Sequence, residues 1–145
     1  MKAAELYDTD FSEWSVRNAE LLRSGQFAEA DLEHIAEEIE DLSKRERRAL
    51  RSAATQILMH LLKYKMQPAK RTRSWLGSID KQRFQIKEIL QESPSLGPAL
   101  PEILAQCYKS AVKMASRQTG IAASEFPAVC PYSVEMLLDD EFPPQ

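Results

Sequence analysis

Residues 31–68 read DLEHIAEEIEDLSKRERRALRSAATQILMHLLKYKMQP, and this stretch decides the fold. Apolar residues recur every three or four positions from Leu32 to Tyr64, which is the spacing of one helix face. Asp31 is a suitable N-cap, and no helix breaker occurs before Pro68. The stretch therefore predicts one helix over residues 31–66, about 54 Å long at 1.5 Å per residue.

The apolar stripe of this helix is interrupted once, at Glu46, inside the polar run SKRERR. Since the helix is nearly twice as long as any other that the sequence predicts, it either bends near residues 43–48 or projects beyond its neighbours. The half of the stripe from Leu32 to Leu42 then needs cover from an earlier helix or from a second copy of the chain. We expect the earlier helix to fold back antiparallel, with its acids Asp8, Asp10 and Glu13 near Arg45, Arg47 and Arg48.

Three further helices are predicted by start and stop signals. The first covers about 11–24, because Asp10 and Glu13 have capping-box spacing and Gly25 can end a helix. The second covers about 74–91, and the third covers about 98–118, with Gly120 closing it.

The segment after Gly120 is broken by prolines and holds one short helical turn after Ser133. No strand pattern and no internal repeat occurs in the sequence. The predicted class is all-α, an irregular bundle of four main helices with a long second helix and a short C-terminal helical turn. A length of 145 residues fits a single domain over 1–145.

The composition excludes several classes of protein. No apolar leader occurs, and no apolar run approaches the length of a membrane span, which favours a cytoplasmic protein without a membrane partner. Cys107 and Cys130 are too few for a disulfide framework or a CxxC-type zinc site. The sequence has no P-loop, dinucleotide-binding or nucleophile-elbow motif, so we predict no cofactor and no known hydrolase, kinase or dehydrogenase mechanism.

Charge is strongly segregated along the chain, although the net charge is only −3. Residues 1–41 carry 12 acids and 3 bases, a balance of −9, and residues 63–87 carry 8 bases and 1 acid, a balance of +7. Residues 42–62 are also basic, and residues 88–145 return to a net −5. Such a chain can neutralise itself on folding, so the basic block is weak evidence for an external polyanion.

Five segments carry a resemblance to a known family: DLEHIAEEIEDLSKRERRAL, HLLKYKMQPAKRTRSW, QRFQI, SPSLGPAL and CPYSVEMLLDDEF. In this order they resemble a bacterial family catalogued as domain of unknown function 29, over Tyr7 to Phe142. The chain departs from the family pattern at Tyr64, where a tryptophan is common, and at Phe84, where a basic residue is usual. The resemblance implies an all-helical fold and no particular activity. Its motif positions include Glu37, Glu38, His60, Lys63, Trp75 and Arg83.

A metal site in a helical bundle needs inward carboxylates and histidines. His34 and Glu38 are an i, i+4 pair, with Glu37 beside them, but the repeated Glu-x-x-His pattern of di-iron proteins is absent. Acids near the start of a helix are also favoured by the helix dipole alone. We therefore predict no metal site, with His34, Glu37 and Glu38 as the residues to test.

His60 is a second candidate, because a hairpin of the long helix and the next one places it near Asp80. A buried pair of this kind raises the histidine pKa and can act as an acid–base unit. A satisfied interior hydrogen bond is the simpler interpretation, since no nucleophile is evident.

The basic junction after Pro68 is the third candidate. Cations just before a helix start are unfavourable unless an anion joins them, so this junction is an anion-site candidate formed by Lys70, Arg71, Arg73 and Arg83. The acidic run LLDDEF near the C-terminus is within reach, and we expect Asp139, Asp140 or Glu141 to pair with Arg71 or Arg73 over Leu137 and Phe142.

The sequence favours a protein-binding or regulatory module over an enzyme, with a second copy of the chain among the candidate partners. The alternative is phosphate or nucleic-acid binding through the basic junction. A metal-dependent enzyme ranks third.

Overall fold

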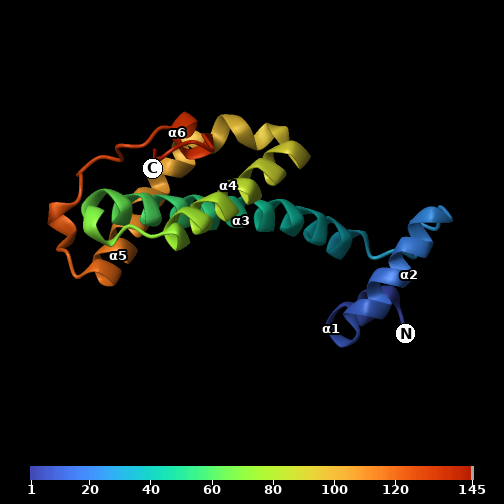
Figure 1. Ribbon diagram of the computed structural model, residues 1–145. Helices are drawn as coiled ribbons and strands as arrows, with labels where there is room; N and C mark the ends of the chain where they lie inside the picture. The colour runs from blue at the N-terminus through green and yellow to red at the C-terminus, as the bar shows by residue number, and fades with distance from the viewer. Residues whose placement is uncertain (145) are drawn as a thin grey trace. The chain divides into compact units, whose positions relative to one another are not determined.

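The computed structural model describes residues 1–144 and is all-α, with no strand in that range. Its helices are α1 (Ala3–Thr9), α2 (Phe11–Arg23), α3 (Leu32–Met66), α4 (Arg73–Glu92), α5 (Leu100–Thr119) and α6 (Val134–Leu138) (Figure 1). Three 3₁₀ turns, Pro68–Lys70, Pro94–Ala99 and Ala123–Glu125, lie between them. No helix within the described part of the chain is long and apolar enough to cross a membrane.

The predicted class and the four main helices are confirmed, and the local signals account for their ends. The Asp10 side chain accepts a hydrogen bond from the Glu13 backbone and caps α2. Gly25 and Gly120 have φ values of 75° and 76°, the left-handed conformation that glycine adopts without strain. Helix α1 was not predicted, and it begins where the Lys2 backbone donates to the Glu5 carboxylate at 3.0 Å.

Helix α3 is helical over 35 residues without interruption, including the polar run 43–48. Arg and Glu are good helix formers, so this run has no intrinsic tendency to end the helix.

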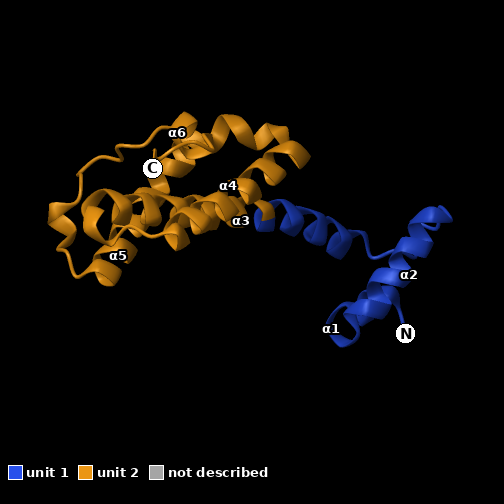
Figure 2. Ribbon diagram, viewed as in Figure 1, with its two compact units in different colours: residues 1–45 blue, residues 46–145 orange. Residues whose placement is uncertain are grey.

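The chain divides into two compact units, Met1–Arg45 and Glu46–Gln145 (Figure 2). Helix α3 contributes its first part to unit 1 and the rest to unit 2. The single-domain expectation stays a prediction.

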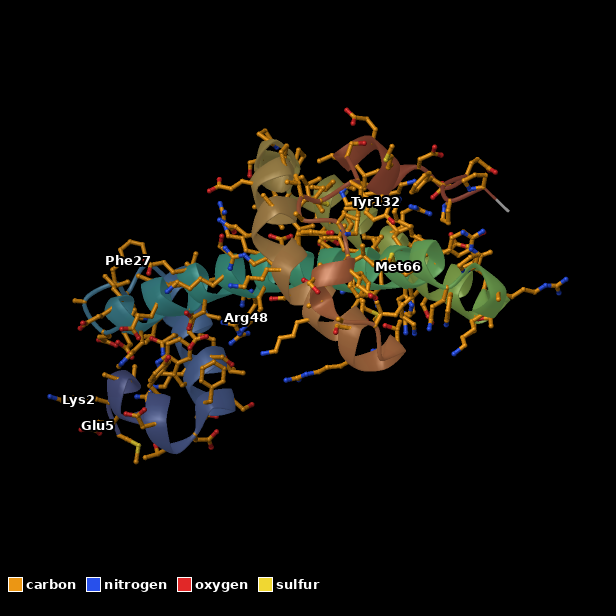
Figure 3. The ribbon with its side chains drawn as sticks, turned by 90° about the vertical axis from the view of Figure 1, so that its left-hand side faces the viewer. Lys2, Glu5, Phe27, Arg48, Met66 and Tyr132 are labelled. Carbon is orange, nitrogen blue, oxygen red and sulfur yellow. The ribbon has the colours of Figure 1, made fainter. Side chains whose placement is uncertain are left out.

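Unit 2 has a continuous apolar core between the second part of α3, α4 and α5. Leu58, Leu62, Ile86 and Ala111 are all fully buried. The segment that follows α5 crosses this unit, and Tyr132 (labelled in Figure 3) donates from its hydroxyl to the Leu61 carbonyl of α3 at 3.1 Å. These contacts fix the path of the segment along the bundle.

The acidic run near the C-terminus returns to α4, as expected, with Leu137 buried beneath it and Phe142 packed on the core. Its predicted partner is wrong, because Asp140 pairs with Lys87 at 2.9 Å and not with Arg71 or Arg73. The reason is that Arg83 binds backbone carbonyls of the same segment. This holds the acids beside Lys87, one helical turn after Arg83 and far from Arg71 and Arg73.

Unit 1 is held together by a polar cluster between α1, α2 and the start of α3. The Trp14 indole donates to Asp31 Oδ2 at 2.9 Å, and the Tyr7 hydroxyl donates to Glu38 at 2.6 Å. Arg45 lies 4.0 Å from Glu38. Arg45 forms no ion pair with Asp8, Asp10 or Glu13 within unit 1, contrary to the prediction. Asp10 instead caps α2. The expectation for Arg47 and Arg48 stays a prediction.

One face of α3 in unit 1 is left uncovered. Leu32, Ile39 and Leu42 are 50%, 62% and 61% exposed, and their spacing of seven and three residues puts them on one side of the helix. Helices α1 and α2 cover a different side of α3, the one that carries His34 and Glu38. Phe27, on the loop before α3, is also exposed (Figure 3). The earlier helix therefore does not cover the stripe as the sequence predicts.

Candidate functional site

A groove of unit 2 lies between α5 and the segment 121–128 that follows it. Gly120 ends α5 and lets the chain turn back along the helix. The Ser116 hydroxyl donates to the Ile121 carbonyl at 2.6 Å and holds the start of this return. The Tyr108 hydroxyl donates to the Pro127 carbonyl at 2.6 Å and holds its end.

The groove has a volume of about 950 Å³ and an apolar floor. Tyr108 and Phe126 are buried beneath it, and Val112 and Pro127 are half-buried along it. Burial raises the pKa of the Tyr108 hydroxyl, which therefore stays protonated and continues to donate to Pro127.

A row of three cations follows one edge of this floor. Lys109, Lys113 and Arg117 recur every four residues on α5, and all three are exposed. No carboxylate of residues 1–144 forms a salt bridge with any of them. Like charges at i, i+4 on a helix repel each other, so this row lowers the stability of α5 unless an anionic group joins it.

The residues that line the groove do not include the usual acid–base or metal-binding groups. Its lining contains no His, Cys, Asp or Glu. The serines along it have no adjacent base that could activate them. The chemistry on offer is an apolar surface with a cationic edge.

The predicted anion site at the start of α4 stays a prediction; a smaller hollow there, of about 570 Å³, has Arg71, Arg73 and Asp80 in its lining. Arg71 is already engaged: its guanidinium lies 3.9 Å from the centre of the Tyr64 ring and donates to the Tyr64 carbonyl at 2.8 Å. The Asp80 carboxylate repels a second anion, so this hollow suits an anion less well than the groove does. Lys70 is exposed at the end of its 3₁₀ turn and does not line the hollow.

Arg83 is not available to an outside anion, which corrects that part of the prediction. It is 1% exposed and donates to the carbonyls of Leu137 and Phe142 at 2.7 and 2.8 Å, and to Met136 at 3.3 Å. Burial lowers its pKa, although nearby carboxylates oppose that shift. The residue fastens the C-terminal segment to α4.

His60 and Asp80 do not form the predicted pair. Asp80 is exposed and lies 3.5 Å from Arg83. The Nδ1 atom of His60 is buried without a hydrogen-bond partner, and burial together with the nearby Lys63 lowers the pKa of the ring. Lys63 itself lies over the Trp75 ring and donates to Gln118. A histidine without an oriented partner does not make an acid–base unit.

Two of the metal candidates, His34 and Glu38, form hydrogen bonds within the polar cluster of unit 1. His34 Nδ1 lies 2.6 Å from Asp31 Oδ2, and its ring stacks on Tyr7 at 3.9 Å between centroids. Glu38 accepts from the Tyr7 hydroxyl. Within residues 1–144 no three His, Cys, Asp or Glu side chains, Glu37 included, are grouped so that they could hold a metal ion.

Hydrogen bonds in this cluster shift three pKa values. The bond to Asp31 raises the pKa of His34, and the bond to Glu38 raises the pKa of Tyr7 to about 12. Burial acts to raise the pKa of Asp31, but the hydrogen bonds from Trp14 and His34 outweigh it and lower the pKa. These shifts favour the charged forms of Asp31 and His34, and the hydrogen bond from Trp14 to Asp31 joins α2 to the start of α3.

A family model described as "Domain of unknown function DUF29" matches residues 6–143. The chain belongs to the DUF29 family. The resemblance seen in the sequence is thereby confirmed over nearly the whole chain. Neither the curated proteins nor the solved structures contain a match to this DUF29 chain.

The sequence did not lead to the groove of this DUF29 protein, although one signal was present. Lys109, Lys113 and Arg117 are the only Lys or Arg residues after position 87, and they share a period of four. The net charge of −5 over residues 88–145 concealed them. Sequence periodicity could not predict the apolar floor of the groove, because the floor depends on how segment 121–128 returns to α5.

Proposed function

We propose that this DUF29 protein is a protein-binding module that takes an acidic, amphipathic helix of its partner into the groove along α5. The observation that carries the proposal is the row Lys109, Lys113 and Arg117 beside an apolar floor, with no carboxylate of residues 1–144 in a salt bridge with it. A helix laid in a groove buries its apolar face and pairs its edge charges with the rim.

The spacing of the cations supports a helical partner. Arg117 lies eight positions after Lys109, which is about 12 Å along α5. Acids at every third or fourth position of a partner helix have the same spacing.

The apolar floor favours a protein over a nucleic acid. Phosphate backbones are bound by polar, strongly basic surfaces, and the net charge of −3 opposes a long polyanion. Tyr108 is buried and is not presented as a stacking platform. The alternative of phosphate or nucleic-acid binding at the start of α4 is therefore kept as an outcome of the test.

The test is a binding titration with three probes: a designed helix with Leu on one face and Glu along its edge, a scrambled peptide of the same composition, and a single-stranded DNA oligonucleotide. We expect the designed helix to bind in a salt-dependent manner, and the scrambled peptide to bind at least about tenfold more weakly. Val112→Asp should weaken the binding of the designed helix without removing a cation.

The matched controls are two triple charge reversals of equal size. The groove variant carries Lys109→Glu, Lys113→Glu and Arg117→Glu, and it should no longer bind the designed helix. The junction variant carries Lys70→Glu, Arg73→Glu and Lys81→Glu at exposed positions outside the groove. This variant should still bind the designed helix. If the wild type binds DNA and only the junction variant loses that binding, the result supports the alternative. If the wild type does not bind the designed helix, the proposal is overturned.

A further inference from the structure

We infer that the helix that occupies the groove is residues 32–42 of a second copy of this chain, so that the protein associates with itself through α3 of one copy and the α5 groove of another. This inference rests on the proposed function of the groove and names its partner.

The first argument is that this segment has the features that the groove requires. It is helical and amphipathic, and its apolar residues Leu32, Ile39 and Leu42 are at least half exposed. No helix of unit 1 covers them. An uncovered row of three large aliphatic side chains on one helix face is typical of a binding surface.

The second argument is charge complementarity. Glu33, Glu37 and Glu40 are exposed, and helical spacing places them on one flank of the apolar row. No Lys, Arg or His within the described residues forms a salt bridge with them. The first and last of them are seven positions apart, or about 10 Å, against about 12 Å for the cation row of α5. Each row repels itself within its own chain, and each would be neutralised by the other.

The third argument is that the segment can dock without leaving unit 1. The contacts that hold it to α1 and α2 are made by Asp31, His34 and Glu38. These residues lie on a different side of α3 from Ile39 and Leu42, so the apolar row is presented while the helix stays anchored. A preorganised helix loses less conformational entropy on binding than a disordered peptide does.

A pairing of α3 with α3 is less favourable. If the apolar rows of two copies were matched residue for residue, Leu32 to Leu42 of one against Leu42 to Leu32 of the other, the acids of the two segments would lie together. Like charges across an interface oppose association. The groove offers the same segment an apolar floor with charges of the opposite sign.

The test is the molar mass of the full chain by light scattering over a range of concentrations, with two charge-reversed variants. The groove variant is the triple reversal defined above, and the stripe variant carries Glu33→Lys, Glu37→Lys and Glu40→Lys. We expect the wild type to associate with increasing concentration and each variant alone to remain monomeric. An equimolar mixture of the two variants should associate again, because both interfaces then pair opposite charges.

Circular dichroism shows whether each variant is folded, and Ile39→Asp provides a second stripe variant that leaves every groove residue intact. A groove variant that still associates, a mixture that stays monomeric, or a wild type that is monomeric at every concentration would each overturn the inference. If the designed acidic helix binds while the wild type remains monomeric, the groove serves an external partner: the proposed function stands and this inference falls. If the designed helix fails to bind, the proposed function falls, whatever the molar mass.

Discussion

The Nε of Arg83 donates a 2.7 Å hydrogen bond to the carbonyl of Leu137, fifty-four residues later in the chain. The same guanidinium donates to Phe142 at 2.8 Å, so one buried cation satisfies carbonyls on both sides of the acidic run. An arginine can do this because its donors form a rigid, planar fork. The C-terminal segment is thus fastened by α4 from within the bundle.

The first prediction concerns the strength of this fastening. Arg83→Met keeps the apolar stem but removes every donor, leaving buried carbonyls of Leu137 and Phe142 without a partner. We expect a loss of about 3 kcal/mol in the free energy of unfolding, measured by urea denaturation. Lys87→Ala removes the exposed pair with Asp140 and should cost at most about 0.5 kcal/mol. Equal losses in the two variants would show that Arg83 has no special role.

The second prediction concerns the wall of the groove. Tyr108→Phe deletes the hydroxyl that donates to the Pro127 carbonyl but retains the buried ring. We expect a loss of about 1 kcal/mol in unfolding free energy, together with weaker binding of the designed acidic helix. Calorimetric titration measures the binding. Unchanged binding in a destabilised variant would mean that segment 121–128 does not need this bond to form the groove.

Local signals in the sequence predicted most of the fold, and long-range contacts account for what they missed. Gly25, Pro68 and Gly120 mark helix ends through their own backbone preferences, so the boundaries of α2, α3 and α5 could be read within a few residues. The capture of Leu137 by Arg83 joins segments far apart in the chain. Until that contact is known, the acidic run has no definite partner, and Arg71 was a reasonable but wrong choice.

The candidate site was harder to predict than the fold for the same reason. Periodicity identified the stripe from Leu32 to Leu42, but the expectation that the earlier helix covers it is wrong, because Leu32, Ile39 and Leu42 are exposed. The groove depends on Gly120 reversing the chain so that Phe126 and Pro127 lie against α5. Charge counted over long blocks also hid the row from Lys109 to Arg117, because acids elsewhere in residues 88–145 outnumber it.

The third prediction is a pH dependence of unit 1. The pKa of His34 is raised, so its contribution to stability is complete below its ordinary value of 6.5 and is lost as the pH rises through the raised value. The pKa of Asp31 is lowered, so its contribution is present above 3.8 and is lost as the pH falls through the lowered value. Unit 1 should therefore be most stable between about 4 and 6.5, and less stable at higher pH.

Trp14 lies in unit 1 and the only other tryptophan, Trp75, lies in unit 2, which allows this to be measured locally. In a Trp75→Phe background, Trp14 fluorescence during urea denaturation reports on unit 1 as the pH is varied. His34→Gln should abolish the decline above 6.5. A decline that persists in this variant would assign the pH dependence to another group.

The last prediction concerns His60, whose effect on stability has the opposite sign. Its Nδ1 is buried without a partner, and burial together with Lys63 lowers its pKa. The unfolded chain therefore takes up a proton near 6.5 that the folded chain resists, and stability falls as the pH drops through that value. His60→Leu removes the unsatisfied atom and should raise the unfolding free energy of unit 2 by about 1 kcal/mol. The gain should be larger below 6.5 than above it, as measured by urea denaturation followed through Trp75. A destabilised His60→Leu variant would show that Nδ1 has a partner in solution and that this histidine contributes more than packing.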